Sequence, residues 1–389
     1  MNIKTTILVL SAIFVIACGT NKLQEANKIL ETFREENKID KRETIFEIET
    51  NYENGILVIS GETDHPELKS KLLSLFSDFK IEDKINLLPD STVGNNNFGL
   101  INLSVANLRS QPNHAAELAT QALLGTPVKI LKKENGWLLI QTPDNYISWV
   151  DSEGIFPVTE MQFDNWKKSK RMIFTGDNGI IFENEDFENP VSDVTMGNIL
   201  EVIELNQKNL KLKLPDGRTG FTEYSNWTDF EDFKNSVKCD STRLKKIANQ
   251  LMGRPYLWGG TSARAMDCSG FVKTLYFMNG VILARDASLQ IDQGEKIEVE
   301  NDFSNLQTGD LLFFGQKQSD GHPQKITHVA LSLGNTEYIH AAGKIGRNSF
   351  EPRSTIYSEY RKNSFAGAKR IIGFENTENI QTIKNHPWY

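Results

Sequence analysis

The chain has 389 residues, enough for roughly two to four domains. Hydrophobic residues make up 39% and charged residues 24% of the sequence, which is typical of a folded globular protein. The formal net charge of −8 argues against a nucleic-acid partner, which would require a basic face. It also disfavours adhesion to anionic lipid by charge alone.

Residues 1–18 have the pattern of an export signal. Lys4 precedes a short apolar run over 5–17, which is too short to span a bilayer as a mature helix. The run ends in Val-Ile-Ala-Cys-Gly, which resembles the bacterial lipobox, whose cysteine is lipidated and becomes the mature N-terminus. This resemblance implies lipidation of Cys18 and an exported chain that its lipid tethers to a membrane in the periplasm or cell envelope. A plain secretory signal cut nearby is the alternative.

Residues 19–95 predict a small α/β unit. Two strand-like runs over 44–49 and 56–61 flank Asn54-Gly55, a dipeptide that favours a tight hairpin turn. Residues 68–79 follow with leucines and phenylalanines at helical spacing, so a helix is expected there.

The next two segments predict a tandem pair of small β-barrels. Short alternating strands with a turn at Asn135-Gly136 occupy residues 96–157, and a weaker copy of the same texture occupies 158–230. Such spacing of strands and turns is typical of a small barrel. The first segment resembles a bacterial SH3 domain.

Residues 235–374 predict an α+β domain, because helices and a glycine-rich loop come first and a run of strands follows. Residues 375–389 form a polar tail, which we expect to be poorly ordered up to its last two aromatic residues.

A cysteine and two histidines carry the chemistry of this last domain. Cys268 lies in Asp-Cys-Ser-Gly-Phe, twelve residues after Tyr256, and is followed by His328 and His340. A thiol, a base and a group that orients the base are the minimum set for nucleophilic acyl transfer. We expect Cys268 at a helix N-terminus, where exposed amides and the helix dipole favour the thiolate. A buried core cysteine and ordinary strand histidines are the plain alternatives.

These motifs resemble those of the NlpC/P60 family of cell-wall cysteine peptidases. The matching pieces include Tyr-x-Trp-Gly-Gly, Asp-Cys-Ser-Gly-Phe, Arg-Asp-Ala-Ser-Leu-Gln, Gly-Asp-Leu-Leu-Phe-Phe and the two histidine segments, all in order. The resemblance implies a papain-like fold over residues 235–374. It implies that Cys268 is the nucleophile, His328 the base and His340 the polar third member. It also places Tyr256 near the nucleophile, in support of the oxyanion.

The whole arrangement, with SH3-like domains before the catalytic domain, resembles the γ-D-glutamyl-L-diamino acid endopeptidases of that family. These enzymes cut the γ-D-Glu–diamino acid bond of murein stem peptides that carry a free N-terminal L-alanine, and release L-Ala-D-Glu. A buried amine requires a carboxylate and a wall that blocks longer substrates. The resemblance implies a substrate pocket made of Glu117, Tyr146, Tyr256, Trp258, Asp267, Ser269, Asp286, Ala287 and Ser288.

Core packing remains the alternative for Trp258, a helix cap for Asp267, and ordinary barrel surface for Glu117 and Tyr146. No metal or organic cofactor is expected, since no Cys/His spacing indicates zinc. We expect no Cys239–Cys268 disulfide, because a bridge would leave the histidines unexplained. We expect a monomer with peptidoglycan peptides as its partner. Two rival functions stay open: a wall-binding lipoprotein with an inactive catalytic domain, and an amidase or acyl-transfer variant of the same fold.

Overall fold

The computed structural model describes residues 21–206, 208–316, 325–375, 377 and 379–389. The export signal and the lipidation of Cys18 lie outside the described residues. The chain divides into two compact units, Met1–Gly94 and Asn95–Tyr389. Within the described residues, no helix combines the length and the apolar character needed to cross a membrane.

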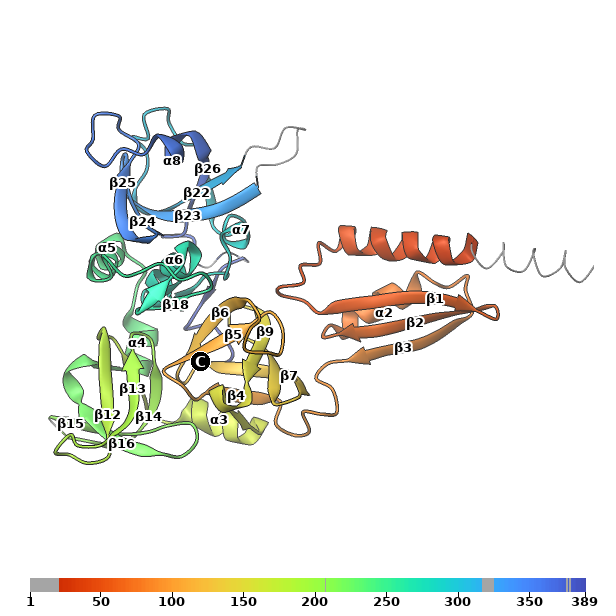
Figure 1. Ribbon diagram of the computed structural model, residues 1–389, viewed down its shortest axis with the longest axis horizontal. Helices are drawn as coiled ribbons and strands as arrows, with labels where there is room; N and C mark the ends of the chain where they lie inside the picture. The colour runs from red at the N-terminus through yellow and green to blue at the C-terminus, as the bar shows by residue number, and fades with distance from the viewer. Residues whose placement is uncertain (1–20, 207, 317–324, 376, 378) are drawn as a thin grey trace, which may run out of the picture. The chain divides into compact units, whose positions relative to one another are not determined.

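The first unit is a three-stranded sheet covered by helices (Figure 1). The strands β1 (Phe46–Glu53) and β2 (Ile56–Thr63) form the predicted hairpin. Asn54 and Gly55 turn it with positive φ angles of 51° and 79°, as the favoured two-residue hairpin turn requires. Helix α2 (Pro66–Ser74) then crosses to β3 (Ile81–Leu87), which pairs parallel to β2. This helix ends earlier than the leucine spacing predicts, and a further helix covers residues 21–36.

The second unit begins with the first SH3-like barrel, called barrel 1 here. Its sheet has the strand order β10-β4-β7-β8-β9-β5-β6. Its elements are β4 (Phe98–Ile101), β5 (Val105–Arg109), β6 (Leu118–Leu123), β7 (Pro127–Glu134), β8 (Trp137–Gln141), β9 (Ile147–Asp151), η1 (Ser152–Gly154) and β10 (Ile155–Val158).

Barrel 2 follows after helix α3 (Glu160–Lys168) and has the strand order β13-β12-β16-β15-β14-β11-β17. In both barrels a single 3₁₀ turn leads into the last strand, which supports the prediction of two tandem copies. The elements of barrel 2 are β11 (Arg171–Phe174), β12 (Asn178–Phe182), β13 (Pro190–Thr195), β14 (Ile199–Leu205), β15 (Asn209–Lys213), β16 (Thr219–Glu223), η2 (Tyr224–Asn226) and β17 (Trp227–Asp229).

The C-terminal domain packs helices on a six-stranded sheet of order β21-β26-β22-β23-β24-β25. Apolar residues of α6, β23 and β24 share one core, which holds α6 against the sheet on the side toward barrel 1 (Figure 1). The α+β prediction is therefore confirmed. The helices are α4 (Phe230–Ser236), α5 (Ser241–Gln250), α6 (Cys268–Phe277), α7 (Ala287–Gln290) and α8 (Glu359–Ser364); the strands are β18 (Thr261–Ser262), β19 (Ala265–Met266), β20 (Val281–Ile282), β21 (Glu295–Ile297), β22 (Thr308–Gln316), β23 (Lys325–Gly334), β24 (Glu337–Ala342), β25 (Lys344–Ser349), β26 (Phe365–Arg370) and β27 (Gln381–Thr382).

The C-terminal tail is packed, contrary to the expectation of poor order. Its strand β27 pairs with β20, and His386 donates from Nε2 to the backbone oxygen of Pro143 in barrel 1 at 3.1 Å. The Tyr389 ring is buried against the rings of Phe230 and Phe277. The polar composition of the tail gave no indication of this packing, because only its few aromatic residues make the buried contacts.

Candidate active site

Cys268 is the first residue of α6, and the glycine-rich loop before it sets its position. Gly259 has a φ of +80°, and a Cβ there would meet the backbone oxygen of Leu118 in barrel 1 at 2.2 Å. A Cβ on Gly270 would meet the oxygen of Gly260 at 2.0 Å. Glycine is therefore required at both positions, because the loop, the helix and barrel 1 pass too close for a side chain.

Burial decides the protonation of the nucleophile. Cys268 is 7% exposed, and this burial, with the nearby charge of Asp267, raises the pKa of its thiol to about 11. The backbone N–H groups of Val329 and Ser269 act in the opposite direction but do not outweigh it. The expectation that the helix terminus alone would favour the thiolate is therefore not met, because desolvation penalises the charged form more strongly. The thiol must give its proton to a base as it reacts.

The two histidines lie on adjacent antiparallel strands, β23 and β24. His328 Nε2 lies 2.7 Å from His340 Nδ1, and the rings meet edge to face. Burial, together with the positive charge of Arg361 on α8, lowers the pKa of His328 to about 2 and that of His340 to about 4. Both rings are thus neutral near pH 7, so His328 can accept a proton from the thiol.

His340 continues the chain of hydrogen bonds to Asn348 on β25. His340 Nε2 lies 2.8 Å from Asn348 Oδ1, and Asn348 Nδ2 donates to the backbone oxygen of Ile356 at 3.0 Å. Asn348 was not predicted from the sequence. The available signal was its position in β25, because a polar side chain two residues beyond the strand partner of His340 lies on the same face of the sheet.

Asp267 is held in a fully hydrogen-bonded network beneath the nucleophile. As the N-cap of α6 it accepts from the backbone N–H groups of Gly270 at 2.7 Å and Gly259 at 3.0 Å. The guanidinium of Arg285, which is 1% exposed, pairs with both carboxylate oxygens at 2.6 and 3.2 Å. Arg285 also donates to Ser269 Oγ at 2.9 Å. Arg285 was quoted in a motif but given no role, although a buried carboxylate needs a cation.

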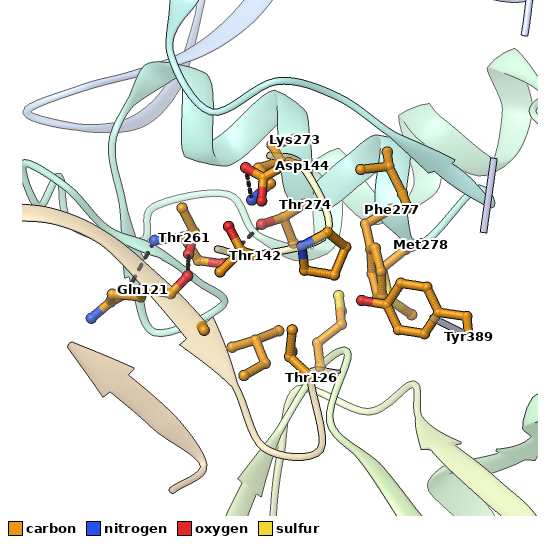
Figure 2. A pocket seen from close by; sticks show the side chains of 15 residues that line it. Gln121, Thr126, Thr142, Asp144, Thr261, Lys273, Thr274, Phe277, Met278 and Tyr389 are labelled. Carbon is orange, nitrogen blue, oxygen red and sulfur yellow. Dashed lines mark hydrogen bonds and ion pairs between the residues drawn. The ribbon is translucent and has the colours of Figure 1, made fainter. Parts of the chain in front are cut away.

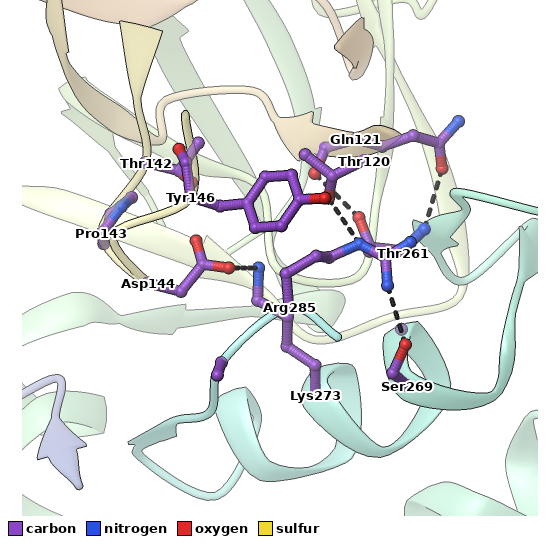
Figure 3. Close-up of polar contacts among 12 residues, drawn as sticks. Thr120, Gln121, Thr142, Pro143, Asp144, Tyr146, Thr261, Ser269, Lys273 and Arg285 are labelled. Atoms are coloured by element: carbon purple, nitrogen blue, oxygen red, sulfur yellow. Dashed lines mark hydrogen bonds and ion pairs between the residues drawn. The ribbon is translucent and has the colours of Figure 1, made fainter. Parts of the chain in front are cut away.

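Barrel 1 meets the C-terminal domain through a set of polar contacts (Figure 3). Arg285 Nε donates to Thr120 Oγ1 at 2.8 Å. Thr261 donates from its backbone N–H to Gln121 Oε1 at 3.1 Å and from Oγ1 to the backbone oxygen of Gln121 at 2.8 Å. Gln121 and Thr261 were also missed, because nothing in either sequence segment indicates the other. These bonds fix barrel 1 against the loop that leads to the nucleophile.

The same interface brings together four of the predicted pocket residues. Trp258 donates from Nε1 to Glu117 Oε1 at 2.7 Å, and its side chain is 62% exposed, which is inconsistent with core packing. The Tyr146 hydroxyl donates to Asp286 Oδ2 at 3.4 Å. Asp286 is in turn the N-cap residue of α7. Each pair joins a barrel 1 residue to a C-terminal-domain residue, so the barrel contributes directly to the wall around the site.

The remaining predicted residues lie around Cys268 and α7. Burial raises the pKa of Tyr256 to about 12, so its hydroxyl remains a donor near the nucleophile. Ala287 is buried at the start of α7, and Ser288 follows it. The structure therefore brings every predicted site residue outside the signal segment into the C-terminal domain or its contact with barrel 1.

A separate small cavity of about 70 Å³ lies between barrel 1, barrel 2 and the C-terminal half of α6 (Figure 2). An ion pair between the buried Asp144 and the partly buried Lys273, at 2.7 Å, lies in its wall, and Tyr389 of the tail also lines it. Burial alone would raise the pKa of Asp144, but Lys273 outweighs it and lowers that pKa. Cys268 does not line this cavity, and the residues around it come from both barrels and the C-terminal domain. We therefore assign the cavity and its ion pair a role in joining the domains.

Among the described residues, no cluster of His, Cys, Asp and Glu has the arrangement of a metal site. Cys239 and Cys268 are both free cysteines, and burial raises the pKa of Cys239 to about 12. The nucleophile therefore retains a thiol that can react.

Known proteins share this architecture. Residues 253–370 match the NlpC/P60 family, and residues 108–155 match the bacterial dipeptidyl-peptidase SH3 domain. Over 268 residues the chain is 26% identical to a γ-D-glutamyl-L-lysine dipeptidyl-peptidase of Bacillus cereus, covering 67% of this chain and 77% of the relative. Over 271 residues it is 30% identical to dipeptidyl-peptidase 6 of Lysinibacillus sphaericus, covering 66% of this chain and 92% of the relative.

A crystal structure of an NlpC/P60 family protein from Bacillus cereus aligns with a TM-score of 0.60 at 21% identity and covers 71% of this chain and 99% of that chain. This likeness supports the fold. The family model over residues 253–370 and the extent of the match to dipeptidyl-peptidase 6 show that the chain belongs to the NlpC/P60 family of peptidases.

Proposed function

We propose that the protein hydrolyses the bond between γ-D-glutamate and a diamino acid in murein stem peptides with a free N-terminal L-alanine, for turnover or recycling of cell wall. The product would be L-Ala-D-Glu. The observation that carries this proposal is the contact of barrel 1 with the active-site loop, through Glu117–Trp258 and Tyr146–Asp286. Two relatives named for dipeptidyl-peptidase activity are similar to this chain over 268 and 271 residues.

The proposed reaction proceeds through a thioester. Cys268 Sγ attacks the γ-carbonyl carbon while its proton passes to His328, because the thiol is neutral before attack. The tetrahedral oxyanion is stabilised by donors near the nucleophile, for which the Tyr256 hydroxyl and the amides at the start of α6 are suited. The carbon–nitrogen bond then breaks, and the amine leaves with the proton from His328. Water attacks the thioester, gives a proton to His328, and the proton returns to sulfur as the dipeptide acid departs.

A free substrate amine needs a negatively charged partner. The negative charge of Asp267 is already compensated by the guanidinium of Arg285. We therefore assign amine recognition to Glu117 and Asp286, which accept hydrogen bonds from the uncharged Trp258 indole and Tyr146 hydroxyl. Both carboxylates lie at the junction of barrel 1 with the C-terminal domain. A substrate with an acylated N-terminus would lose the charge attraction there and would meet the barrel.

The test is cleavage of L-Ala-γ-D-Glu-L-Lys and its diaminopimelate analogue, free and N-acetylated, followed by mass spectrometry of the products. We expect cleavage of the free peptides, slower cleavage of the acetylated ones, and no cleavage by Cys268→Ala. Glu117→Gln should raise KM for the free peptide by roughly 10-fold, the value of a weakened charge-assisted hydrogen bond. Cleavage of neither form would favour the wall-binding or amidase alternatives, and equal cleavage of both would contradict the amine requirement.

We also propose that the chain is exported and lipidated at Cys18, on the strength of its lipobox-like segment. The wild-type protein should incorporate labelled palmitate in a bacterial host and fractionate with membranes, whereas Cys18→Ala should do neither. Label in both proteins, or in neither, would contradict the proposal.

A further inference from the structure

The hydrogen-bonded chain behind the nucleophile extends one residue beyond the cysteine and the two histidines. It runs from His328 through His340 to Asn348, on three consecutive strands of one sheet, with distances of 2.7 and 2.8 Å. His340 is 3% exposed. In such a buried setting each polar ring atom depends on a protein partner for its hydrogen bond, because bulk solvent has little access to it.

The orientation of the Asn348 amide determines which group donates and which accepts in each of these hydrogen bonds. Its Nδ2 donates to the backbone oxygen of Ile356, and that oxygen also accepts from the backbone N–H of Ser349 at 2.9 Å. A flipped amide would place Oδ1 against the Ile356 oxygen, with no hydrogen between them. Oδ1 therefore faces His340, and an amide oxygen can only accept a hydrogen bond.

The consequence passes along both rings. His340 Nε2 must carry a hydrogen to donate to Asn348, so in the neutral ring its Nδ1 carries a lone pair. That lone pair accepts from His328 Nε2–H. Neutral His328 is then left with its lone pair on Nδ1, the ring nitrogen that does not face His340 and that remains for the proton of Cys268.

We propose that Asn348 is a positioning residue that sets the tautomers of both histidines and so keeps His328 able to act as a base. Without the Asn348 acceptor, His340 can place its hydrogen on Nδ1 and present it to His328. His328 Nε2 then becomes the acceptor and Nδ1 carries the hydrogen, so the ring cannot take the thiol proton. A wrong tautomer of the base is costly in serine proteases, because the geometry persists while the reactive lone pair is lost.

This inference rests on the peptidase activity of Cys268 but not on the identity of the substrate. The first readout is therefore free of substrate: the rate of alkylation of Cys268 by iodoacetamide, followed on the Cys268 peptide by mass spectrometry. Alkylation requires loss of the thiol proton, so it reports the base directly. If the peptides above were not cleaved but alkylation behaved as expected, the substrate proposal would fail and this one would stand.

Asn348→Leu should slow alkylation near pH 7 and lower kcat by roughly 10- to 100-fold, the effect of losing one buried hydrogen bond, with KM unchanged. Asn348→Asp retains an oxygen acceptor toward His340 and should recover most of the rate, with the acid limb of its pH profile moved to higher pH because a negative charge stabilises imidazolium. Ser349→Ala is the matched control: it removes side-chain hydrogen bonds from the same strand without touching the histidines and should leave both rates unchanged.

Nitrogen-15 NMR of histidine-labelled Cys268→Ala protein supplies the decisive readout. We expect the hydrogen of His340 on Nε2 when Asn348 is present and a population with it on Nδ1 in the Asn348→Leu background. Unchanged tautomers with full activity in Asn348→Leu would overturn the inference. Equal losses in the Leu and Asp variants, with tautomers unchanged, would assign Asn348 a structural role only and would also overturn it.

Discussion

Replacing Arg285 with methionine should destabilise the second unit strongly, because it leaves a buried carboxylate without its cation. The Arg285 and Asp267 side chains are 1% and 8% exposed, and their closest atoms are 2.6 Å apart. Removing one partner of a buried pair typically costs about 3–5 kcal/mol. The variant also loses donation to Thr120 and Ser269, at about 1 kcal/mol each when such partners remain buried. These terms are not additive, so we expect a total of about 4 kcal/mol.

Chemical denaturation of the wild type and of Arg285→Met, followed by tryptophan fluorescence, measures this cost. The matched cycle adds Asp267→Asn and the double variant. The double variant should be more stable than Arg285→Met alone, because it removes the unpaired charge. A cost below about 1 kcal/mol for Arg285→Met, or no recovery in the double variant, would refute the view that Asp267 is held by Arg285 rather than left to bind substrate.

Three further outcomes are expected. The pKa values of His328 and His340, about 2 and 4, lie below the ordinary 6.5, so the folded state resists protonation. The free energy of unfolding should therefore be at its full value above about pH 6.5 and should fall toward pH 4 by at most about 1.4 kcal/mol per histidine per pH unit. A flat profile in unfolding titrations would contradict the burial argument. Deleting residues 387–389 removes the buried ring of Tyr389 and the partly buried ring of Trp388. This deletion should lower stability by roughly 2–4 kcal/mol, measured by thermal melting, and an unchanged Tm would show that the tail does not join the domains. Gly259→Ala combines a positive φ with a clash against barrel 1, whereas Gly253→Ala has a similar φ and open space; melting curves and KM should therefore change much more for the first, and equal effects would show that only backbone strain matters.

Much of the fold could be predicted from local patterns. The Asn54-Gly55 and Asn135-Gly136 turns lie at positive φ angles between paired strands, because turn chemistry depends on adjacent residues alone. The order of helices and strands in the C-terminal domain followed from periodicity in the same way. Local patterns did not predict the packing of the C-terminal tail, since its few buried residues contact partners that are far away in the sequence.

The same distinction between local and long-range signals applies to the residues of the candidate active site. Cys268, His328 and His340 were recognised because each lies in a short motif whose residue types suit nucleophilic chemistry. Asn348 and the pairing of Arg285 with Asp267 were not, because a hydrogen bond between strands or across a helix start leaves no local signature.

The sequence by itself determined the kind of chemistry, the family and the strand and turn pattern of the domains, since each of these depends on residue types at short spacings along the chain. Only the tertiary structure decided the protonation of the thiol, the direction of the histidine chain and the engagement of Asp267. The physical reason is that a pKa and a tautomer depend on burial and on the groups within a few ångströms. In this protein those groups come from barrel 1, from α8 and from β25, each remote in sequence from the cysteine that they serve.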